Sequence, residues 1–297
     1  MKKLLLIVNP YAGQRKVGKH LAEIIDIFNR ADYEVIAHIT ASSGDCENMV
    51  MYYASQIDLV VCCGGDGTFN ETISGVLRSG LDIPVGYIPA GSTNDFANSL
   101  GLSTNILQAA RDIVEGQPTR FDVGTFAGRH FSYVASFGAF TRTSYSTPQS
   151  AKNALGHLAY VLGGIQELSQ IKPHHLKFSL PDGTEIEDDF IFGAVSNSTC
   201  VGGVLTLAPD RVDMADGLLE VLLIRSPKSL AELTDCLVAL QKQTYNCAMI
   251  TFLSTPSASV TAPETMDWTL DGEQQTGLAQ IEIQCRHKAL QLMYKRG

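Results

Sequence analysis

The stretch that decides the fold reads LVVCCGGDGTFNE and occupies residues 59–71. Its first five residues form a continuous apolar run of strand length, and residues 70–78 have helical character. Gly64, Gly65 and Gly67 lie at the junction between the two. Such a turn lets backbone N–H groups approach a phosphate closely, and the helix N-terminus favours negative charge. The stretch therefore predicts a phosphate-binding turn at the carboxyl end of a buried strand.

One acidic residue, Asp66, lies inside this turn. A carboxylate beside a phosphate is repelled unless a divalent cation lies between them, so Asp66 indicates a Mg²⁺ site. The alternative is an ordinary glycine-rich turn in which Asp66 caps the following helix. The turn alone does not decide between these two interpretations.

The same alternation of strands and helices extends on both sides of this stretch. We predict strands at residues 4–8, 33–39, 59–63 and 85–88, and helices at residues 17–28, 47–55, 70–78 and 104–115. Strands that alternate with helices form a parallel sheet covered on both faces. Small-residue turns also follow the first and fourth predicted strands, at Asn9–Gly13 and Pro89–Phe96. We expect an α/β nucleotide-binding domain at residues 1–125, with ligands at the carboxyl ends of its strands.

From about Phe121 onward the pattern changes to short strands separated by turns. The predicted strands lie at residues 130–135, 175–180, 185–195, 218–224 and 257–261, and helices interrupt them at residues 155–170 and 230–242. Asp-Gly pairs mark several tight turns. We expect a β-sandwich domain at residues 126–297. Its last strand-like segments, residues 280–285 and 290–294, either close the second sheet or return to the first domain.

Composition excludes several classes of protein. A chain of 297 residues that is 45% hydrophobic and 18% charged can bury a core, and at about 150 residues per domain it holds two domains. Its 22 basic and 31 acidic residues give a net charge of −9, which argues against a nucleic-acid-binding protein. The seven cysteines form no CxxC motif, so we expect reduced thiols in a cytosolic protein. The apolar run at residues 4–8 is too short for a signal peptide, and no stretch approaches the ~18 apolar residues of a spanning helix.

Two basic stretches are candidates for contact with phosphates or lipid headgroups. Residues 13–20 almost match the P-loop pattern, but His20 stands where that pattern needs a hydroxyl for Mg²⁺. The basic residues of this first stretch face phosphates or lipid, or form a solvated helix face: Arg15, Lys16 and Lys19. The second stretch contains Lys172, His174, His175 and Lys177. Because the net charge opposes attraction to anionic lipid, membrane contact must be local.

Taken in order, the motifs resemble those of the diacylglycerol kinase catalytic family. The matching residues are Asn9-Pro10-x-x-Gly13, Gly64–Thr68, Gly91–Phe96, Asn197, Gly202-Gly203, Pro209, Asp216–Glu220 and Trp268–Glu273. NAD kinases and phosphofructokinases share GGDG, whereas the later Asp-Gly-Leu and Asp-Gly-Glu favour a lipid kinase. The chain is most similar to the soluble bacterial diacylglycerol kinase branch. The resemblance implies an α/β nucleotide domain followed by a β-sandwich domain.

The resemblance also implies that the chain binds ATP together with Mg²⁺. The implied ATP contacts are Asn9, Pro10, Tyr11, Ala12, Gly13, Thr40, Gly65, Asp66, Gly67, Thr68, Phe69, Asn70, Glu71, and Ser92 or Thr93. Glu273 matches the proton acceptor of the family. Three carboxylates match an acidic cluster near the transferred phosphate: Asp66, Asp95 and Asp122.

A structural Mg²⁺ site is implied at Asp213, Asp216 and Leu218, with Asp213 and Leu218 acting through backbone carbonyls. Two positions depart from the family pattern. Gln14 replaces a common lysine, so a headgroup-facing cation must come from a neighbouring basic residue. Ala215 replaces an aspartate, which leaves the implied metal site one carboxylate poorer.

The expected function is ATP-dependent phosphorylation of the diacylglycerol hydroxyl, which gives phosphatidic acid. We expect the active site in the cleft between the two domains, with domain closure gating the reaction. The alternatives are a kinase for a sphingoid base or other lipid, an NAD kinase-like enzyme, and a non-catalytic nucleotide-binding regulator. A binding-only protein has no need of Glu273, which speaks against the last alternative. The expected partner is a lipid substrate at the inner face of the membrane, the expected location is the cytoplasm, and a homodimer is left open.

Overall fold

The computed structural model describes residues 1–13, 17–138, 172–201 and 205–295. The chain forms two compact units. Unit 1 comprises Met1–Val123 and His287–Gly297, and unit 2 comprises Gly124–Arg286. The predicted helix at residues 155–170 lies outside the described residues, as do Gln14, Arg15 and Lys16.

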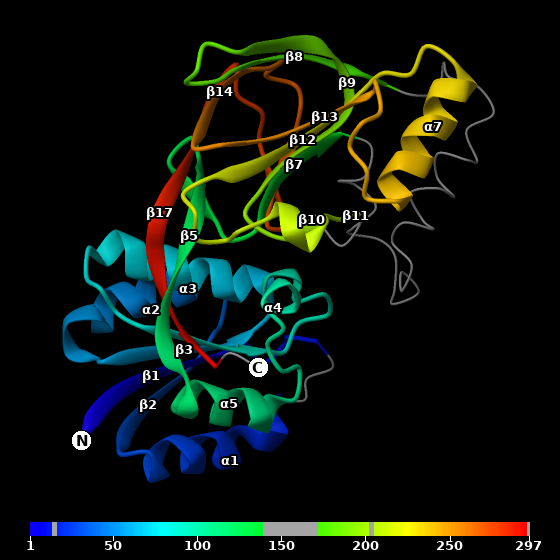
Figure 1. Ribbon diagram of the computed structural model, residues 1–297. Helices are drawn as coiled ribbons and strands as arrows, with labels where there is room; N and C mark the ends of the chain where they lie inside the picture. Colours follow the sequence, from blue (N-terminus) through cyan, green and yellow to red (C-terminus); the bar gives the residue numbers. More distant parts are fainter. Residues whose placement is uncertain (14–16, 139–171, 202–204, 296–297) are drawn as a thin grey trace. The chain divides into compact units, whose positions relative to one another are not determined.

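Unit 1 is a parallel sheet covered by helices on both faces (Figure 1). Its elements are β1 (Lys2–Val8), α1 (Val17–Arg30), β2 (Tyr33–Ile39), α2 (Asp45–Tyr53), the 3₁₀ helix η1 (Ala54–Gln56), β3 (Leu59–Gly64), α3 (Asp66–Ser79), β4 (Val85–Pro89), α4 (Asp95–Ser99), α5 (Ile106–Glu115) and the first part of β5 (Gln117–Phe126). The strand order is β2-β1-β3-β4, and each pair is parallel. The predicted α/β fold class is confirmed.

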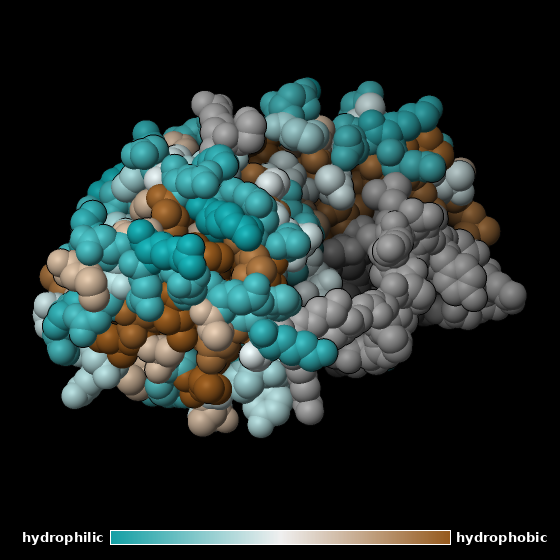
Figure 2. All heavy atoms as spheres, turned by 90° about the horizontal axis from the view of Figure 1, so that it is seen from below, coloured by the Kyte–Doolittle hydropathy of each residue, from teal (hydrophilic) through white to brown (hydrophobic). Residues whose placement is uncertain are grey.

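The core of unit 1 follows from the sequence pattern. The strands β1 and β3 are buried on both faces, which is why they read as continuous apolar runs. On one face, the apolar side of α1 buries Val17, Ile24 and Phe28 against the sheet beside α5. Partly buried apolar side chains of α1 and α5 remain visible between hydrophilic ones when the molecule is seen from below (Figure 2). The opposite face is covered by α2 and α3 (Figure 1).

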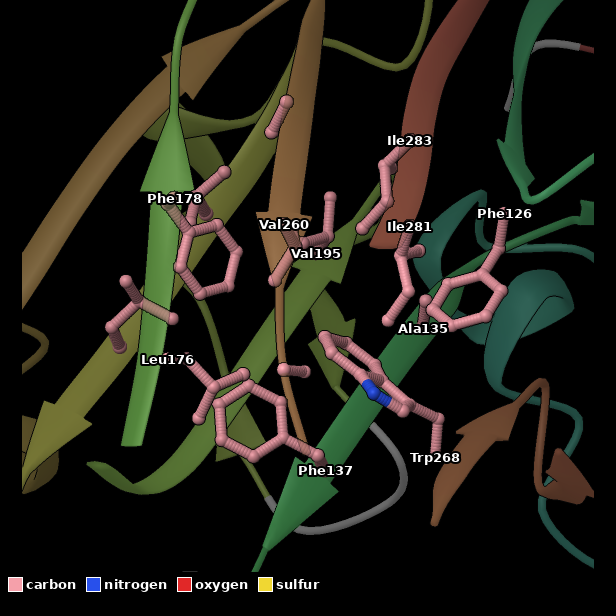
Figure 3. Close-up of a cluster of buried hydrophobic side chains, with 14 of the residues drawn as sticks. Phe126, Ala135, Phe137, Leu176, Phe178, Val195, Val260, Trp268, Ile281 and Ile283 are labelled. Atoms are coloured by element: carbon pink, nitrogen blue, oxygen red, sulfur yellow. The ribbon is translucent and has the colours of Figure 1, made fainter. Parts of the chain in front are cut away.

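Unit 2 is built almost entirely from antiparallel strands. Its elements are β6 (Arg129–Phe131), β7 (Val134–Gly138), β8 (His174–Ser179), β9 (Glu185–Ser196), β10 (Cys200–Val201), β11 (Leu205–Thr206), the 3₁₀ helix η4 (Pro209–Arg211), β12 (Leu219–Arg225), α7 (Leu230–Gln241), β13 (Ile250–Thr255), β14 (Ser257–Thr261), β15 (Trp268–Leu270), β16 (Glu273–Gln275) and the first part of β17 (Gln280–Tyr294). The single tryptophan, Trp268, packs between Phe126 and Phe137, with ring centroids 5.0 and 4.7 Å away (Figure 3). Aromatic rings thus fill the centre of the β core.

The observed strands differ from the predicted ones in three places. The predicted strand at residues 130–135 is two strands, because the chain leaves the ladder at Ser132 and Tyr133. Strand β5, which precedes β6, was not predicted. The two final segments are one strand, β17, whose first part pairs with β14 and whose Leu292 pairs in parallel with Val85 of β4. This strand begins in unit 2 and ends in unit 1.

Candidate active site

The turn after β1 and the turn after β3 are joined directly. The side-chain amide of Asn9 donates a hydrogen bond of 2.9 Å to the Thr68 hydroxyl. The Asn9 side-chain oxygen also accepts the Tyr11 N–H at 2.9 Å, which fixes the first turn. Gly13 has a φ of 52°, and a Cβ there would lie 2.4 Å from the carbonyl oxygen of Ala90. The first turn therefore also packs against the turn after β4.

The turns after β3 and β4 approach each other through glycine. A Cβ on Gly91 would lie 2.6 Å from the Cα of Gly65, so only hydrogen fits between the two backbones. The Asn94 side chain closes the third turn, since its oxygen accepts the Gly91 N–H at 2.8 Å and its amide donates to the Gly91 carbonyl at 3.1 Å. Asn94 has a φ of 52°, a left-handed conformation that asparagine tolerates well. The structure thus brings together all three predicted turns at one edge of the sheet.

Asp66 lies at the centre of this group of turns. It is the first residue of α3 and is 8% exposed. Its carboxylate accepts hydrogen bonds from the Thr93 hydroxyl at 3.3 Å, the Asp95 N–H at 3.2 Å and the Phe96 N–H at 3.4 Å. Asp66 therefore caps the neighbouring helix α4. This arrangement brings the Asp66 carboxylate to the backbone of the buried Asp95.

A second carboxylate of α3 fixes the loop between β2 and α2. Glu71 accepts hydrogen bonds from the Ser43 hydroxyl at 3.0 Å and the Gly44 N–H at 2.8 Å. Thr40 is buried at the start of this loop, and its N–H donates to the Val8 carbonyl at 2.9 Å. The predicted contacts Thr40 and Glu71 therefore shape a fourth loop at the same edge of the sheet.

The remaining predicted nucleotide contacts differ in exposure. Gly13, Ser92 and Thr93 are exposed, whereas Ala12 and Asn70 are buried. The other predicted contacts on this edge are Pro10, Tyr11 and Gly67, of which Tyr11 is exposed.

Phe69 was also predicted to contact ATP, but its side chain belongs to the core. The ring is fully buried and stacks on Tyr87 at 4.2 Å between centroids. It packs against Phe96 at 4.6 Å. The backbone N–H of Phe69 donates to the Gly65 carbonyl at 3.0 Å within the helix. The Phe69 side chain therefore packs in the core beside the turn, and the predicted contact of this residue with ATP stays a prediction.

Asp122 occupies a different environment from Asp66. It is fully buried on β5, and its carboxylate accepts the Lys288 N–H at 2.6 Å and is 3.1 Å from Nδ1 of His287. Both partners lie on β17 within unit 1. In the part of the chain that the structure describes, no group of three or more His, Cys, Asp or Glu is placed to hold a metal ion. The Asp66 carboxylate thus contacts the backbone N–H of Asp95, whereas the Asp122 carboxylate contacts β17, and the predicted acidic cluster near the transferred phosphate stays a prediction.

Glu273 follows the tip of the β15–β16 hairpin in unit 2. Asp271 and Gly272 form the two-residue turn, with φ values of 49° and 84°, as expected for a primed hairpin turn. Leu270 pairs with Glu273 across the turn. The Glu273 side chain is exposed, whereas the Asp271 carboxyl is buried and accepts hydrogen bonds from residues 132–134. The sequence indicates Asp271 as a turn residue within the family motif, but nothing local reveals these hydrogen-bond partners.

The implied structural metal site lies in two consecutive turns before β12. The Asp213 carboxylate accepts the Ala215 N–H at 3.0 Å, and the Asp216 carboxylate accepts the Leu218 N–H at 2.9 Å. Both carboxylates are exposed. The Asp216 carboxylate and the backbone carbonyls of Asp213 and Leu218 are oxygen donors of the kind that hard divalent cations prefer. The chemistry of these donors therefore fits Mg²⁺.

The second basic stretch is not a free positive patch. His175 lies 2.9 Å from Asp189 and 3.3 Å from Glu187, and these carboxylates raise its pKa. Lys177 forms an ion pair of 2.9 Å with Glu185. The charges of His175 and Lys177 are thus paired along β8 and β9, and contact of this stretch with a membrane stays a prediction. In unit 1, Lys19 of α1 is exposed.

No helix among the described residues is long and apolar enough to cross a membrane. The seven cysteines are all free. Burial raises the pKa of Cys63 to about 12, so its thiol stays protonated.

Comparison with known proteins agrees with this architecture. Residues 3–126 match the diacylglycerol kinase catalytic domain, and residues 134–294 match the YegS C-terminal NAD kinase beta sandwich-like domain. A diacylglycerol kinase from Bacillus subtilis (strain 168) is 32% identical over 275 residues, covering 92% of this chain and 90% of that protein. A diacylglycerol kinase from Staphylococcus saprophyticus is 29% identical over 274 residues, covering 92% of this chain and 89% of that protein.

Solved structures share the fold over nearly the full length. A crystal structure of a diacylglycerol kinase from Bacillus anthracis str. Sterne has a TM-score of 0.76 at 24% identity, and covers 99% of this chain and 97% of its own. A second crystal structure from the same strain has a TM-score of 0.82 at 26% identity, with the same coverage. Both domains are matched in order, and one relative is 32% identical over 92% of this chain. This chain therefore belongs to the diacylglycerol kinase catalytic family and is a kinase.

Proposed function

We propose that this chain transfers the γ-phosphoryl group of ATP to the hydroxyl of diacylglycerol, giving phosphatidic acid and ADP. The observation that carries the proposal is the buried Asp66 carboxylate, held among three glycine-containing turns at the start of α3. The names of the relatives point to the same lipid substrate. Phosphoryl transfer needs positioning and charge neutralisation above all, and this edge of unit 1 supplies the groups for both.

The phosphates of ATP bind at the turn before α3. The glycines at 64 and 65 keep side chains away from the helix start, and the first turn of α3 presents backbone N–H groups that have no partner within the helix. The helix dipole adds a favourable interaction with negative charge. Asn9 and Thr68 fix the neighbouring turn, so the backbone there is already in place before ATP binds.

Asp66 would hold Mg²⁺ near the phosphates. The three hydrogen bonds to its carboxylate fix the orientation of both oxygens, and carboxylate oxygens are ligands that Mg²⁺ prefers. When bound, Mg²⁺ neutralises the charge on the β- and γ-phosphates. Asp216, together with the backbone carbonyls of Asp213 and Leu218, would hold a second, structural Mg²⁺.

Glu273 accepts the proton of the lipid hydroxyl. The hydroxyl oxygen forms a bond to the γ-phosphorus, the bond between that phosphorus and the bridging β–γ oxygen breaks, and ADP leaves. The proton passes to the Glu273 carboxylate, whose exposed side chain is accessible to a substrate. A general base of this kind needs hydrogen-bond reach and not an extreme pKa. The lipid itself stays in the membrane, which the protein contacts locally through α1.

The test is a kinase assay with radiolabelled ATP and diacylglycerol in mixed micelles. Parallel assays offer a sphingoid base, monoacylglycerol and NAD as acceptors. We expect labelled phosphatidic acid to form at least ten times faster than any other product. Faster labelling of a different acceptor would contradict the proposed substrate, and ATP binding without labelling of any acceptor would contradict catalysis.

A further inference from the structure

We propose that Asp271 is a positioning residue: its buried carboxylate fastens the hairpin that carries Glu273 to the segment Ser132–Val134. The inference rests on the proposed role of Glu273 as proton acceptor. The Asp271-Gly272 pair is typical of a β-hairpin turn, but the Asp271 side chain accepts hydrogen bonds that such a turn does not need.

Four hydrogen bonds converge on the Asp271 carboxylate. The N–H and the hydroxyl of Ser132 donate to one oxygen at 2.5 and 2.8 Å. The N–H groups of Tyr133 and Val134 donate to the other oxygen, both at 3.0 Å. The backbone N–H of Asp271 donates in return to the Val134 carbonyl at 2.9 Å. Residues 132 and 133 interrupt the strand ladder between β6 and β7, and their N–H groups turn to Asp271 instead.

Only an acceptor with two oxygens satisfies all four donors. The residue is 4% exposed, so an unsatisfied donor there would not be compensated by water. An asparagine would place its own NH₂ group against N–H donors. Asparagine at position 271 therefore loses at least one bond and gains a donor–donor contact, although its volume is almost unchanged.

This anchor decides where Glu273 lies. β16 is only three residues long, and within the described part of the chain it pairs with β15 alone. β15 is held by the core through Trp268 and Leu270, but the backbone reverses immediately after it. Asp271 is the first residue of that reversal, and Glu273 is the first residue after it. A small rotation of the turn is therefore passed directly to the Glu273 side chain, and catalytic rates fall steeply with such displacements.

A double-mutant cycle tests the inference. Asp271→Asn and Glu273→Gln are made singly and together, and kcat and KM for ATP are measured for each. We expect Asp271→Asn to lower kcat about 10- to 100-fold with KM for ATP within about twofold of wild type. Because a base that is absent needs no positioning, adding Asp271→Asn to Glu273→Gln should lower kcat by less than about twofold. Asp235→Asn, at an exposed position of α7 in unit 2, is the control and should behave as wild type.

Ser132→Ala keeps the inference testable if Asp271→Asn does not fold. It removes one of the four donors and leaves the carboxylate in place. We expect a loss of about threefold to tenfold in kcat that disappears in the Glu273→Gln background. Equal losses in both backgrounds would overturn the inference while leaving the proposed function intact. Normal kcat in Glu273→Gln itself would overturn both the proposed role of Glu273 and the anchor, and so separates failure of that role from failure of the anchor alone.

Discussion

The two regions that carry the proposed chemistry are built in opposite ways. At the edge of unit 1, glycines and short polar side chains from three successive turns fix one another through backbone contacts, such as that between Gly65 and Gly91. At the hairpin of unit 2, one buried carboxylate fixes a turn to a segment 137–139 positions earlier in the chain. The first region binds through its backbone, whereas the second presents a single side chain. Their tolerance of substitution should therefore differ.

The largest expected effect is the loss of kcat when Glu273, an exposed residue of the hairpin, is substituted. Glu273→Gln keeps the size of the residue and removes the proton acceptor, so kcat should fall by about 10²–10⁴ while ATP binding persists. Steady-state kinetics on mixed micelles measures this. Glu264→Gln, another exposed glutamate of unit 2, is the control. Turnover near the wild-type rate in Glu273→Gln would reassign Glu273 to a structural role.

A substitution in the glycine-containing turns of unit 1 should instead weaken the binding of ATP. In Gly91→Ala the added methyl would lie 2.6 Å from the Cα of Gly65, so the two turns must separate. We expect the dissociation constant for ATP to rise about tenfold or more, with a loss of thermal stability. Isothermal titration calorimetry and thermal melting measure the two effects. Gly18→Ala is the control, because a Cβ there meets nothing within 4 Å. Unchanged affinity in Gly91→Ala would show that the close approach does not shape the nucleotide site.

The Asp271 anchor also predicts a pH dependence of stability. Burial raises the pKa of Asp271 to about 6, against the hydrogen bonds from residues 132–134 that lower it. Between about pH 4 and 6 the folded state therefore binds more protons than the unfolded state. This contribution to the free energy of unfolding is fully present below about pH 4 and is lost as the pH rises through about 6.

The measurement is urea unfolding at several pH values for wild type, Asp271→Asn and Ser132→Ala. Relative to Asp271→Asn, wild type should lose about 3 kcal/mol of stability as the pH rises from about 4 to above 6. Ser132→Ala removes a hydrogen bond to the ionised form of Asp271, which should raise the pKa of Asp271 further. The loss of stability in this variant should therefore extend to higher pH. A difference between wild type and Asp271→Asn that does not change with pH would contradict a raised pKa at this site.

The sequence predicted unit 1 well because its signals are local. The apolar runs of β1 and β3, and the glycines at 64, 65 and 67, define strands and a turn within a dozen residues. Parallel strands bring successive turns to one edge, so the grouping of the three turns followed directly. The individual bonds did not follow. That Asp66 caps α4 depends on a distance between two helices, which no local pattern reports.

Unit 2 was harder to predict because its important contacts are distant in sequence. The Asp271-Gly272 dipeptide predicts a turn, but no feature of the sequence predicts that Ser132 donates a hydrogen bond to Asp271. The same contact explains why the predicted strand at residues 130–135 is broken. The ion pairs of the second basic stretch were missed for a related reason: the partners Glu185, Glu187 and Asp189 lie across the β8–β9 hairpin, and a count of charges along the chain ignores them.

The smallest expected effect concerns the lipid surface and distinguishes paired from unpaired charge. Lys19 on α1 is exposed, whereas Lys177 is paired with Glu185. A basic side chain near an anionic surface contributes about 1 kcal/mol, and the attraction decays within about 8–10 Å at physiological salt. Lys19→Glu should therefore lower activity on anionic mixed micelles a few-fold, and added salt should reduce the difference.

Activity of Lys19→Glu on a short-chain, water-soluble diacylglycerol should not change, and Lys177→Gln should match wild type on both substrates. Equal losses on both substrates would place Lys19 at the nucleotide or headgroup phosphates and not at the membrane, and no loss on either would leave α1 as a solvated helix face.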